Sequence, residues 1–334
     1  MELTTVADDE AVLHDGTEVR RITDLLPDAV HEVAGVRFRT LPAPGELLCR
    51  FATVNDVHFG ETECGVITGV ETPVFTAEPG ADPYPEVMNR GAVAEIAAID
   101  PAVVLAKGDL TNDGTPEEYA RFLEVYGGAF GDRLHHIRGN HDAYRGQTEA
   151  PSDPVLVDLP GVRLAMIDTT LPHHAGGGID PEQLEWLDDV AADADRPVMV
   201  FGHHHVWSPD NSPRPDEYFG IDPSSSEALV DLVVRRPSVI GYFAGHTHRN
   251  RVRHISVTGG VPWVEVACVK DFPGSWAEYR VFEGGVLQIH RRISTAEALR
   301  WSERCRGLYA GIIDYVDYAF GDVDDRCFAV WPRA

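Results

Sequence analysis

The sequence predicts an α/β fold built on a largely parallel sheet, and two observations carry this prediction. From Arg50 onward, short apolar segments typical of buried strands alternate with segments whose apolar residues recur at helical spacing. Alternating strands and helices form crossover units, which produce parallel strands. In addition, four of five short polar clusters follow directly on an apolar run, as at the ligand-binding edge of an open α/β sheet.

The expected elements run from residue 51 to residue 292. An irregular stretch that contains several Pro and Gly residues, 60–84, interrupts them after the first strand. In chain order they are strand 51–56, helix 87–99, strand 102–109, helix 116–127, strand 134–140, strand 162–168, helix 181–192, strand 197–203, helix 224–236, strand 239–246, and the segments 251–257, 261–269 and 277–292. We expect the last three segments to form successive antiparallel strands.

Both ends of the chain lie outside this alternating pattern. Residues 1–48 carry short alternating patches and turn signals, and we expect a β-rich extension packed on the main domain. The main domain should cover residues 49–292. Residues 293–334 should form a C-terminal helical and aromatic extension, with its helix at 295–309.

Composition excludes several classes of protein. The net charge of −26 repels nucleic-acid backbones, so a polymeric nucleic-acid partner is not expected. No apolar stretch is long enough to span a bilayer. The first residues, MELTTVADDEAVLHDG, lack the basic region and apolar core of a signal peptide, so we expect a cytoplasmic protein. The five cysteines form no CxxC pair and should be reduced thiols, although a bridge between Cys305 and Cys327 stays open.

The five polar clusters supply side chains that suit a metal site. In chain order they are DVH at 56–58, GDLTND at 108–113, GNHD at 139–142, GHHH at 202–205 and GHTH at 245–248. Alternate residues of a strand point to one face, so Asp56 and His58 can hold one cation together if the strand persists there. Asp109 lies too far from Pro116 to cap the next helix, and its two carboxylate oxygens can bridge two cations.

The remaining clusters add neutral ligands. Asn140 offers a carbonyl oxygen, and a simple turn would explain Gly139-Asn140 but not the His-Asp that follows. His246 and His248 lie two residues apart after a buried strand. Each cluster alone is a weak signal, but the ordered series at strand ends indicates a metal centre.

The order and content of these clusters resemble the calcineurin-like metallophosphoesterases, which hydrolyse phosphate esters with two metal ions. The resemblance covers roughly residues 50–290 and implies a four-layer α/β/β/α sandwich, with two mixed sheets between outer helices. It makes residues 49–292 the catalytic domain. Relatives commonly have H-x-P in the fourth cluster, with the first His as ligand. Val206 stands at the Pro position, so this register selects His204, with His203 as the alternative.

Carried over position by position, the family pattern implies two ligand sets. The first metal takes Asp56, His58, Asp109 and His248, and the second takes Asp109, Asn140, His204 and His246. Imidazole and carboxylate ligands suit Mn, Fe or Zn. The two ions would share a hydroxide that attacks phosphorus in line. His141 would protonate the leaving alkoxide or bind a phosphate oxygen, a hydrogen bond to the ligands being the alternative, and Asp142 would orient it.

Three local patterns select a branch of this family. Serine/threonine protein phosphatases usually carry GDxxDRG where this chain has GDLTNDG, and purple acid phosphatases need a Tyr where it has Asn112. The segment 168–187, DTTLPHHAGGGIDPEQLEWL, instead resembles class III cyclic-nucleotide and glycerophosphodiester phosphodiesterases. The expected activity is therefore hydrolysis of small phosphodiesters.

Other activities stay open at this point. A phosphomonoesterase, a nuclease-like enzyme and a lipid-head-group hydrolase would use the same metals, although the acidic surface disfavours the nuclease. A non-catalytic scaffold would tend to lose ligands, whereas every expected ligand type is present. The expected partner is a small phosphate ester, and a homodimer stays open. The stretches 60–84 and 206–222 should shape the pocket, where Tyr84, Trp207, Tyr218 and Phe219 are candidates for stacking on a base.

Overall fold

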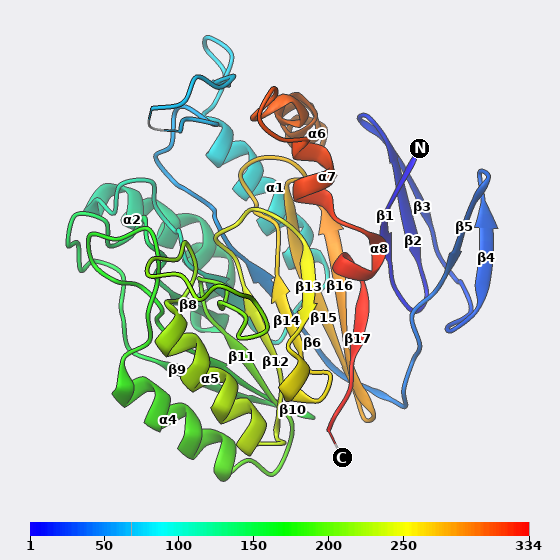
Figure 1. The fold of residues 1–334 in the computed structure, drawn as a ribbon. Helices are drawn as coiled ribbons and strands as arrows, with labels where there is room; N and C mark the ends of the chain where they lie inside the picture. Colours follow the sequence, from blue (N-terminus) through cyan, green and yellow to red (C-terminus); the bar gives the residue numbers. More distant parts are fainter. Residues whose placement is uncertain (68, 334) are drawn as a thin grey trace.

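Two six-stranded mixed sheets stack between helices in the computed structural model, which describes residues 1–67 and 69–333 (Figure 1). The strand orders are β17-β16-β15-β6-β7-β8 and β13-β14-β12-β11-β10-β9. Side chains from both sheets, among them Phe51, Leu105 and Phe243, form one apolar layer between them. The predicted four-layer α/β/β/α sandwich is therefore confirmed.

The first sheet carries three parallel strands from the first half of the chain. Its members are β6 (Leu47–Val54), β7 (Val104–Lys107), β8 (Leu134–Ile137), β15 (Ser275–Phe282), β16 (Gly285–Arg292) and β17 (Phe328–Val330). β6, β7 and β8 are parallel, so their carboxyl ends meet at one edge. β17 was not predicted, and it gives the C-terminal extension a place at the edge of this sheet.

The second sheet is parallel at its centre and antiparallel at its edges. Its members are β9 (Val155–Leu159), β10 (Val162–Met166), β11 (Val198–Phe201), β12 (Val239–Ala244), β13 (Arg251–His254) and β14 (Pro262–Glu265). The expectation of successive antiparallel strands from residue 251 onward is only partly right. β14 lies parallel to β12, and the chain then crosses to the other sheet, where β15 pairs with β6.

Helices cover the outer faces of both sheets. The helical elements are α1 (Tyr84–Ala98), α2 (Pro116–Phe122), α3 (Gly128–Phe130), α4 (Pro181–Ala192), α5 (Pro223–Arg235), α6 (Ala296–Arg304), α7 (Tyr315–Phe320), α8 (Val323–Arg326), the π-helical segment Leu123–Gly127, and short 3₁₀ turns at Gly131–Arg133, Ser256–Thr258 and Cys305–Gly307. α1, α2, α6 and α7 pack on the first sheet, and α4 and α5 on the second. Among the described helices, none is both long and apolar enough to cross a membrane.

Local sequence signals explain where three of these helices begin. α2, α4 and α5 each start with Pro, behind the capping residues Thr115, Asp180 and Asp222. The cap side chains accept hydrogen bonds from backbone N–H groups of the first turn, which otherwise have no partner. Pro suits that first position because it has no N–H to leave unpaired.

The N-terminal residues form a separate small sheet beside the first main sheet (Figure 1). It comprises β1 (Glu2–Val6), β2 (Ala11–Asp15) and β3 (Glu18–Ile22), and a hairpin of β4 (Val30–Val33) and β5 (Val36–Arg39) follows. Thr5 donates to the carbonyl of His290 at 2.8 Å, and His14 Nε2 lies 3.1 Å from Ser294 Oγ. The division of the chain near residues 48 and 292 stays a prediction. All five cysteines, Cys305 and Cys327 included, are free thiols.

Candidate metal centre

The five polar clusters converge because the parallel strands of both sheets end at neighbouring edges. The strands β6, β7, β8, β11 and β12 each end within two residues of the start of one cluster. Potential ligand atoms from different clusters lie within 4.8 Å of one another, for example those of Asp56, Asp109 and His203. Asp56 and His248 belong to another such cluster, so side chains up to 192 residues apart in sequence come together here.

The first group contains all the residues predicted to bind the first metal. His248 Nε2 lies 3.4 Å from Asp56 Oδ1, and His58 Nε2 lies 3.5 Å from Asp109 Oδ2. Neither ring nitrogen of His58, which is buried, has a hydrogen-bond partner among the described residues. A buried polar group without a partner is costly. A cation bound by one of these nitrogens would give it a partner, so this donor set fits a metal ion.

Asp109 connects this group to a second one. Its Oδ2 lies 3.3 Å from His203 Nε2 as well as 3.5 Å from His58 Nε2. Burial alone would raise the pKa of Asp109, but the charges of His203 and His141 hold it well below its ordinary value. Asp109 is therefore an ionised carboxylate between two sets of imidazoles, as a residue that bridges two cations must be.

The second group contains Asn140, His203 and His246 beside Asp109. His203 Nε2 lies 3.1 Å from Asn140 Oδ1, and His203 Nδ1 lies 2.8 Å from the carbonyl of Lys107. His246 Nε2 lies 2.8 Å from the carbonyl of Phe219, which leaves its Nδ1 for a metal. Three side chains from three clusters thus offer nitrogen and oxygen donors next to Asp109.

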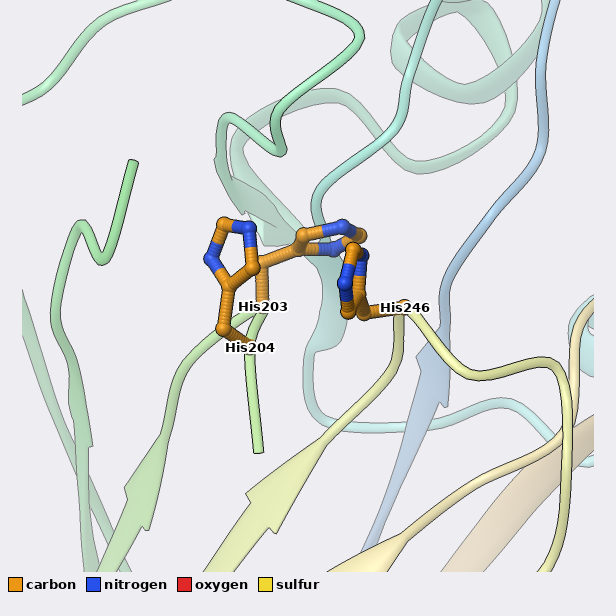
Figure 2. A group of neighbouring side chains, drawn as sticks. All are labelled: His203, His204 and His246. Atoms are coloured by element: carbon orange, nitrogen blue, oxygen red, sulfur yellow. The ribbon is translucent and has the colours of Figure 1, made fainter. Parts of the chain in front are cut away.

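The structure brings both candidate ligands of the fourth cluster, His204 and its alternative His203, close to His246. The rings of His203, His204 and His246 gather at the ends of β11 and β12 (Figure 2). Both ring nitrogens of His204 have protein partners, at 2.9 Å from Thr169 Oγ1 and 3.2 Å from the carbonyl of Ala175, and those of His203 have partners too. His203 Nε2, however, also lies 3.3 Å from Asp109 Oδ2, so the geometry favours His203, the alternative residue, and the choice between the two stays a prediction.

His141 lines the cavity, and one of its ring nitrogens lies within 4.8 Å of ligand atoms of His58 and Asp109, although the family pattern does not count it as a ligand. Its backbone N–H donates to Asp109 Oδ1 at 2.9 Å, and its ring Nδ1 lies 2.7 Å from the carbonyl of Asn112. The carbonyl can only accept, so Nδ1 carries the proton in this contact. Nε2 is then the nitrogen left for a substrate.

Asp142 has a different environment from the one expected. Its carboxylate accepts hydrogen bonds from the backbone N–H groups of Leu110, Thr111 and Gly139 and from the Thr111 hydroxyl. Burial and the nearby Asp109 raise the pKa of Asp142 to about 6. Asp142 thus ties the loop after β7 to the loop after β8, while the hydrogen bond of the His141 ring is to the carbonyl of Asn112.

Backbone strain is concentrated at the ligands. Five of them have left-handed backbone conformations, with φ of 52° at Asp56, 48° at His58, 50° at Asp109, 68° at His246 and 55° at His248. Such conformations are uncommon outside glycine and cost roughly 1–3 kcal/mol each, and they cluster at functional sites. The strand β6 has already ended before Asp56, so these turns, and not strand alternation, bring Asp56 and His58 together.

A cavity of about 740 Å³ opens over the ligands. Its wall includes residues of the stretch 60–84, such as Glu61 and Glu63, and Phe219 from the stretch 206–222. Of the four aromatic residues proposed for stacking, Phe219 is among the residues that line this cavity, whereas Tyr84, Trp207 and Tyr218 are not.

Sequence reasoning missed part of this site. Tyr309, Ile313, Tyr315 and Tyr318 of the C-terminal extension also line the cavity, and Asp271 lies 3.1 Å from the ligand His248. The sequence signals for the extension were a predicted helix at 295–309 and a high content of Tyr and Asp, and neither pointed to the cavity. Asp271 belongs to none of the five clusters.

The geometry agrees with comparisons to known proteins. The profile of the calcineurin-like phosphoesterase family matches residues 49–250. The chain belongs to this family. A solved dimetal phosphatase from Danio rerio has the same fold, with a TM-score of 0.53 at 17% identity over 74% of this chain and 97% of that one. The family accounts for the two mixed sheets and for the buried His and Asp clusters.

Three curated relatives of this calcineurin-like phosphoesterase are phosphodiesterases. It is 35% identical over 164 residues to a glycerophosphodiester phosphodiesterase of Enterobacter lignolyticus, covering 44% of this chain and 56% of the relative. It is 28% identical to a 3',5'-cyclic adenosine monophosphate phosphodiesterase of Pseudomonas aeruginosa, covering 47% and 58%. It is 29% identical to a probable cyclic nucleotide phosphodiesterase of Rhodococcus erythropolis, covering 64% and 68%. The matches to the first two relatives span little more than half of their length.

Proposed function

We propose that this calcineurin-like phosphoesterase is a two-metal phosphodiesterase that acts on small phosphodiesters. The observation that carries the proposal is the position of Asp109, whose Oδ2 lies between His58 Nε2 at 3.5 Å and His203 Nε2 at 3.3 Å. A carboxylate shared by two sets of imidazoles has the donor chemistry of a two-metal hydrolase. The phosphodiesterase activity of the curated relatives supports the choice of reaction.

Each metal would have four protein ligands. Asp56, His58, Asp109 and His248 would hold the first, and Asp109, Asn140, His203 and His246 the second. When bound, the two ions supply a water of lowered pKa and neutralise charge on the phosphoryl oxygens. The mixture of imidazole and carboxylate donors suits Mn, Fe or Zn.

His141 is the proposed general acid. Its ring lines the cavity, and the hydrogen bond from Nδ1 to the carbonyl of Asn112 fixes the ring so that Nε2 is the free position. In its doubly protonated form, His141 can pass the proton of Nε2 to a leaving alkoxide, which is a poor leaving group without one, and the ring keeps the proton on Nδ1. Asp142 holds the loop that carries His141 but takes no proton in this scheme.

The charges of the cavity wall favour a diester over a monoester. Glu61 and Glu63 line the cavity, and Lys270 is paired with Glu61 at 2.5 and 2.7 Å. A phosphomonoester carries between about 1.5 and 2 negative charges at neutral pH, whereas a diester carries a single one. Lys270, which also lines the cavity, neutralises Glu61, and the remaining Glu63 carboxylate repels the more highly charged monoester more strongly than the diester. The chain's net charge of −26 disfavours a polymeric nucleic acid in the same way.

The test is a substrate panel with added Mn²⁺. It includes bis(p-nitrophenyl) phosphate, p-nitrophenyl phosphate, cyclic nucleotides and glycerophosphodiesters. We expect metal-dependent hydrolysis of at least one diester with a kcat/KM above that for the monoester. A protein that binds no stoichiometric metal and hydrolyses no member of the panel would contradict the proposal. A preference for the monoester would retain the two-metal site but refute its assignment to diesters.

A further inference from the structure

Asp271 lies behind the ligand His248, on the side of the imidazole that faces away from the proposed metal. Asp271 Oδ2 is 3.1 Å from His248 Nδ1, while Nε2 of the same ring is 3.4 Å from Asp56 Oδ1. Asp271 is fully buried. A histidine that binds a metal through one nitrogen commonly donates its other N–H to a carboxylate, which fixes the ring and makes it a stronger ligand. Asp271 is placed to act in this way.

The other oxygen of Asp271 is held by two further side chains. The Tyr315 hydroxyl donates to Oδ1 at 2.7 Å, and Cys268 Sγ lies 3.0 Å from the same atom. These contacts fix the plane of the carboxylate, so that Oδ2 is directed at His248. The contacts therefore form a buried chain from Tyr315 through Asp271 to His248.

Tyr315 comes from a part of the chain that the family profile does not cover. It begins α7 in the C-terminal extension, whereas the profile ends at residue 250. Other contacts hold the extension against the same region. The Tyr318 hydroxyl donates to the carbonyl of Thr247 at 3.1 Å, next to His248, and Trp301 Nε1 donates to the carbonyl of Lys270 at 2.8 Å, next to Asp271. The extension thus supports two loops of the metal centre.

We propose that Asp271 and Tyr315 are positioning residues for the first metal, so that the C-terminal extension completes the metal centre of this protein. The inference rests on the proposed two-metal function. It has a selective consequence, because His248 belongs only to the first ligand set. Weakening the contact between Asp271 and His248 should lower the affinity of one metal and leave that of the other unchanged.

Metal titration of the apoprotein tests this consequence directly. Wild type, Asp271→Asn and Tyr315→Phe are titrated with Mn²⁺ by calorimetry, and bound metal is counted after dialysis. Asparagine keeps the size of the side chain but removes its charge. We expect one binding step of Asp271→Asn to weaken by about 10- to 100-fold, with the other step unchanged. Tyr315→Phe should weaken the same step by a smaller factor, because Cys268 still holds the carboxylate.

A matched control separates positioning from loss of stability. Tyr279→Phe removes a buried hydroxyl on β15 that donates to Gln288 Oε1 on β16 at 2.9 Å, away from the ligands. It should lower the melting temperature as Tyr315→Phe does but leave both binding steps unchanged. Turnover of Asp271→Asn should recover at high Mn²⁺ concentration, which a misfolded site would not show.

Three outcomes would contradict either the positioning role of Asp271 and Tyr315 or the proposed two-metal function, and the titration distinguishes them. Unchanged affinities for both metals in both variants would overturn the positioning role. Equal weakening of both steps would also overturn it, since it would indicate general loosening. A wild type that binds fewer than two equivalents would instead contradict the proposed function itself. If Asp271→Asn does not fold, the titration of Tyr315→Phe decides, with a selective loss supporting the inference and no change overturning it.

Discussion

Replacing Asp109 with Asn is the sharpest test of the bridging carboxylate. The substitution keeps the size of the side chain, and Asn tolerates the left-handed backbone, φ 50°, that this position requires. It removes the negative charge between the two proposed ions. Two divalent cations about 4 Å apart repel each other by roughly 17 kcal/mol at an effective dielectric constant of 20, because a pair of unit charges there interacts by about 4 kcal/mol.

Without the carboxylate between them, much less of this repulsion is offset, and the two ions should no longer bind together. We expect Asp109→Asn to retain at most one metal equivalent and to lose essentially all metal-dependent turnover of bis(p-nitrophenyl) phosphate. Metal content is measured by mass spectrometry after dialysis, and turnover by the release of p-nitrophenolate. Circular dichroism checks that the fold persists.

Asp113→Asn is the matched control for this experiment. Asp113 belongs to the same GDLTND cluster, but it is partly exposed and pairs with Arg145 at 2.9 Å. Such surface pairs contribute between about 0 and 1 kcal/mol, so this variant should bind two metals and turn over normally. If Asp109→Asn kept two equivalents and turned over within about tenfold of wild type, the bridging role of Asp109 would be refuted.

Three further predictions follow from the same geometry. His203→Ala should lose the second metal while His204→Ala keeps it, and metal analysis giving the reverse would restore the register drawn from the sequence. His141→Ala should keep both metals but lose roughly 10²–10⁴-fold in turnover of alkyl diesters and much less for p-nitrophenyl esters, and equal losses for both would indicate phosphate binding instead. Burial, and then the charge of Arg292, lowers the pKa of His14 to about 3, so only the unfolded chain takes up this proton between about pH 6.5 and pH 3. The free energy of unfolding should therefore decrease as the pH is lowered. His14 should account for a loss of about 2 kcal/mol between pH 7 and pH 5. Urea unfolding at both pH values should show a smaller loss for His14→Gln than for wild type, and equal losses would refute the assignment to His14.

The sequence by itself determined most of the elements and the types of ligand. The predicted helix at 181–192 has the same bounds as α4, because its Pro start and its apolar spacing are local signals. Asp109 and His246 could be singled out because each follows a fully buried strand, and strand ends are set by local hydrophobic runs. The family resemblance then supplied the four layers, which residue patterns alone do not specify.

Only the tertiary structure decided how these side chains meet. Three consecutive histidines look alike in sequence, and their directions depend on backbone torsions and on neighbours such as Asp109 and Thr169 that lie far away in the chain. The same holds for Asp142, whose carboxylate is taken up by backbone N–H groups of another loop.

The contribution of the C-terminal extension was equally hidden from the sequence. Tyr315 reaches Asp271 across 44 positions, and Asp271 reaches His248 across 23. Hydrophobic periodicity reports which residues face the nearest layer of the fold, over one or two turns of helix or one strand. It carries no information about hydrogen bonds between segments that only the folded chain brings together.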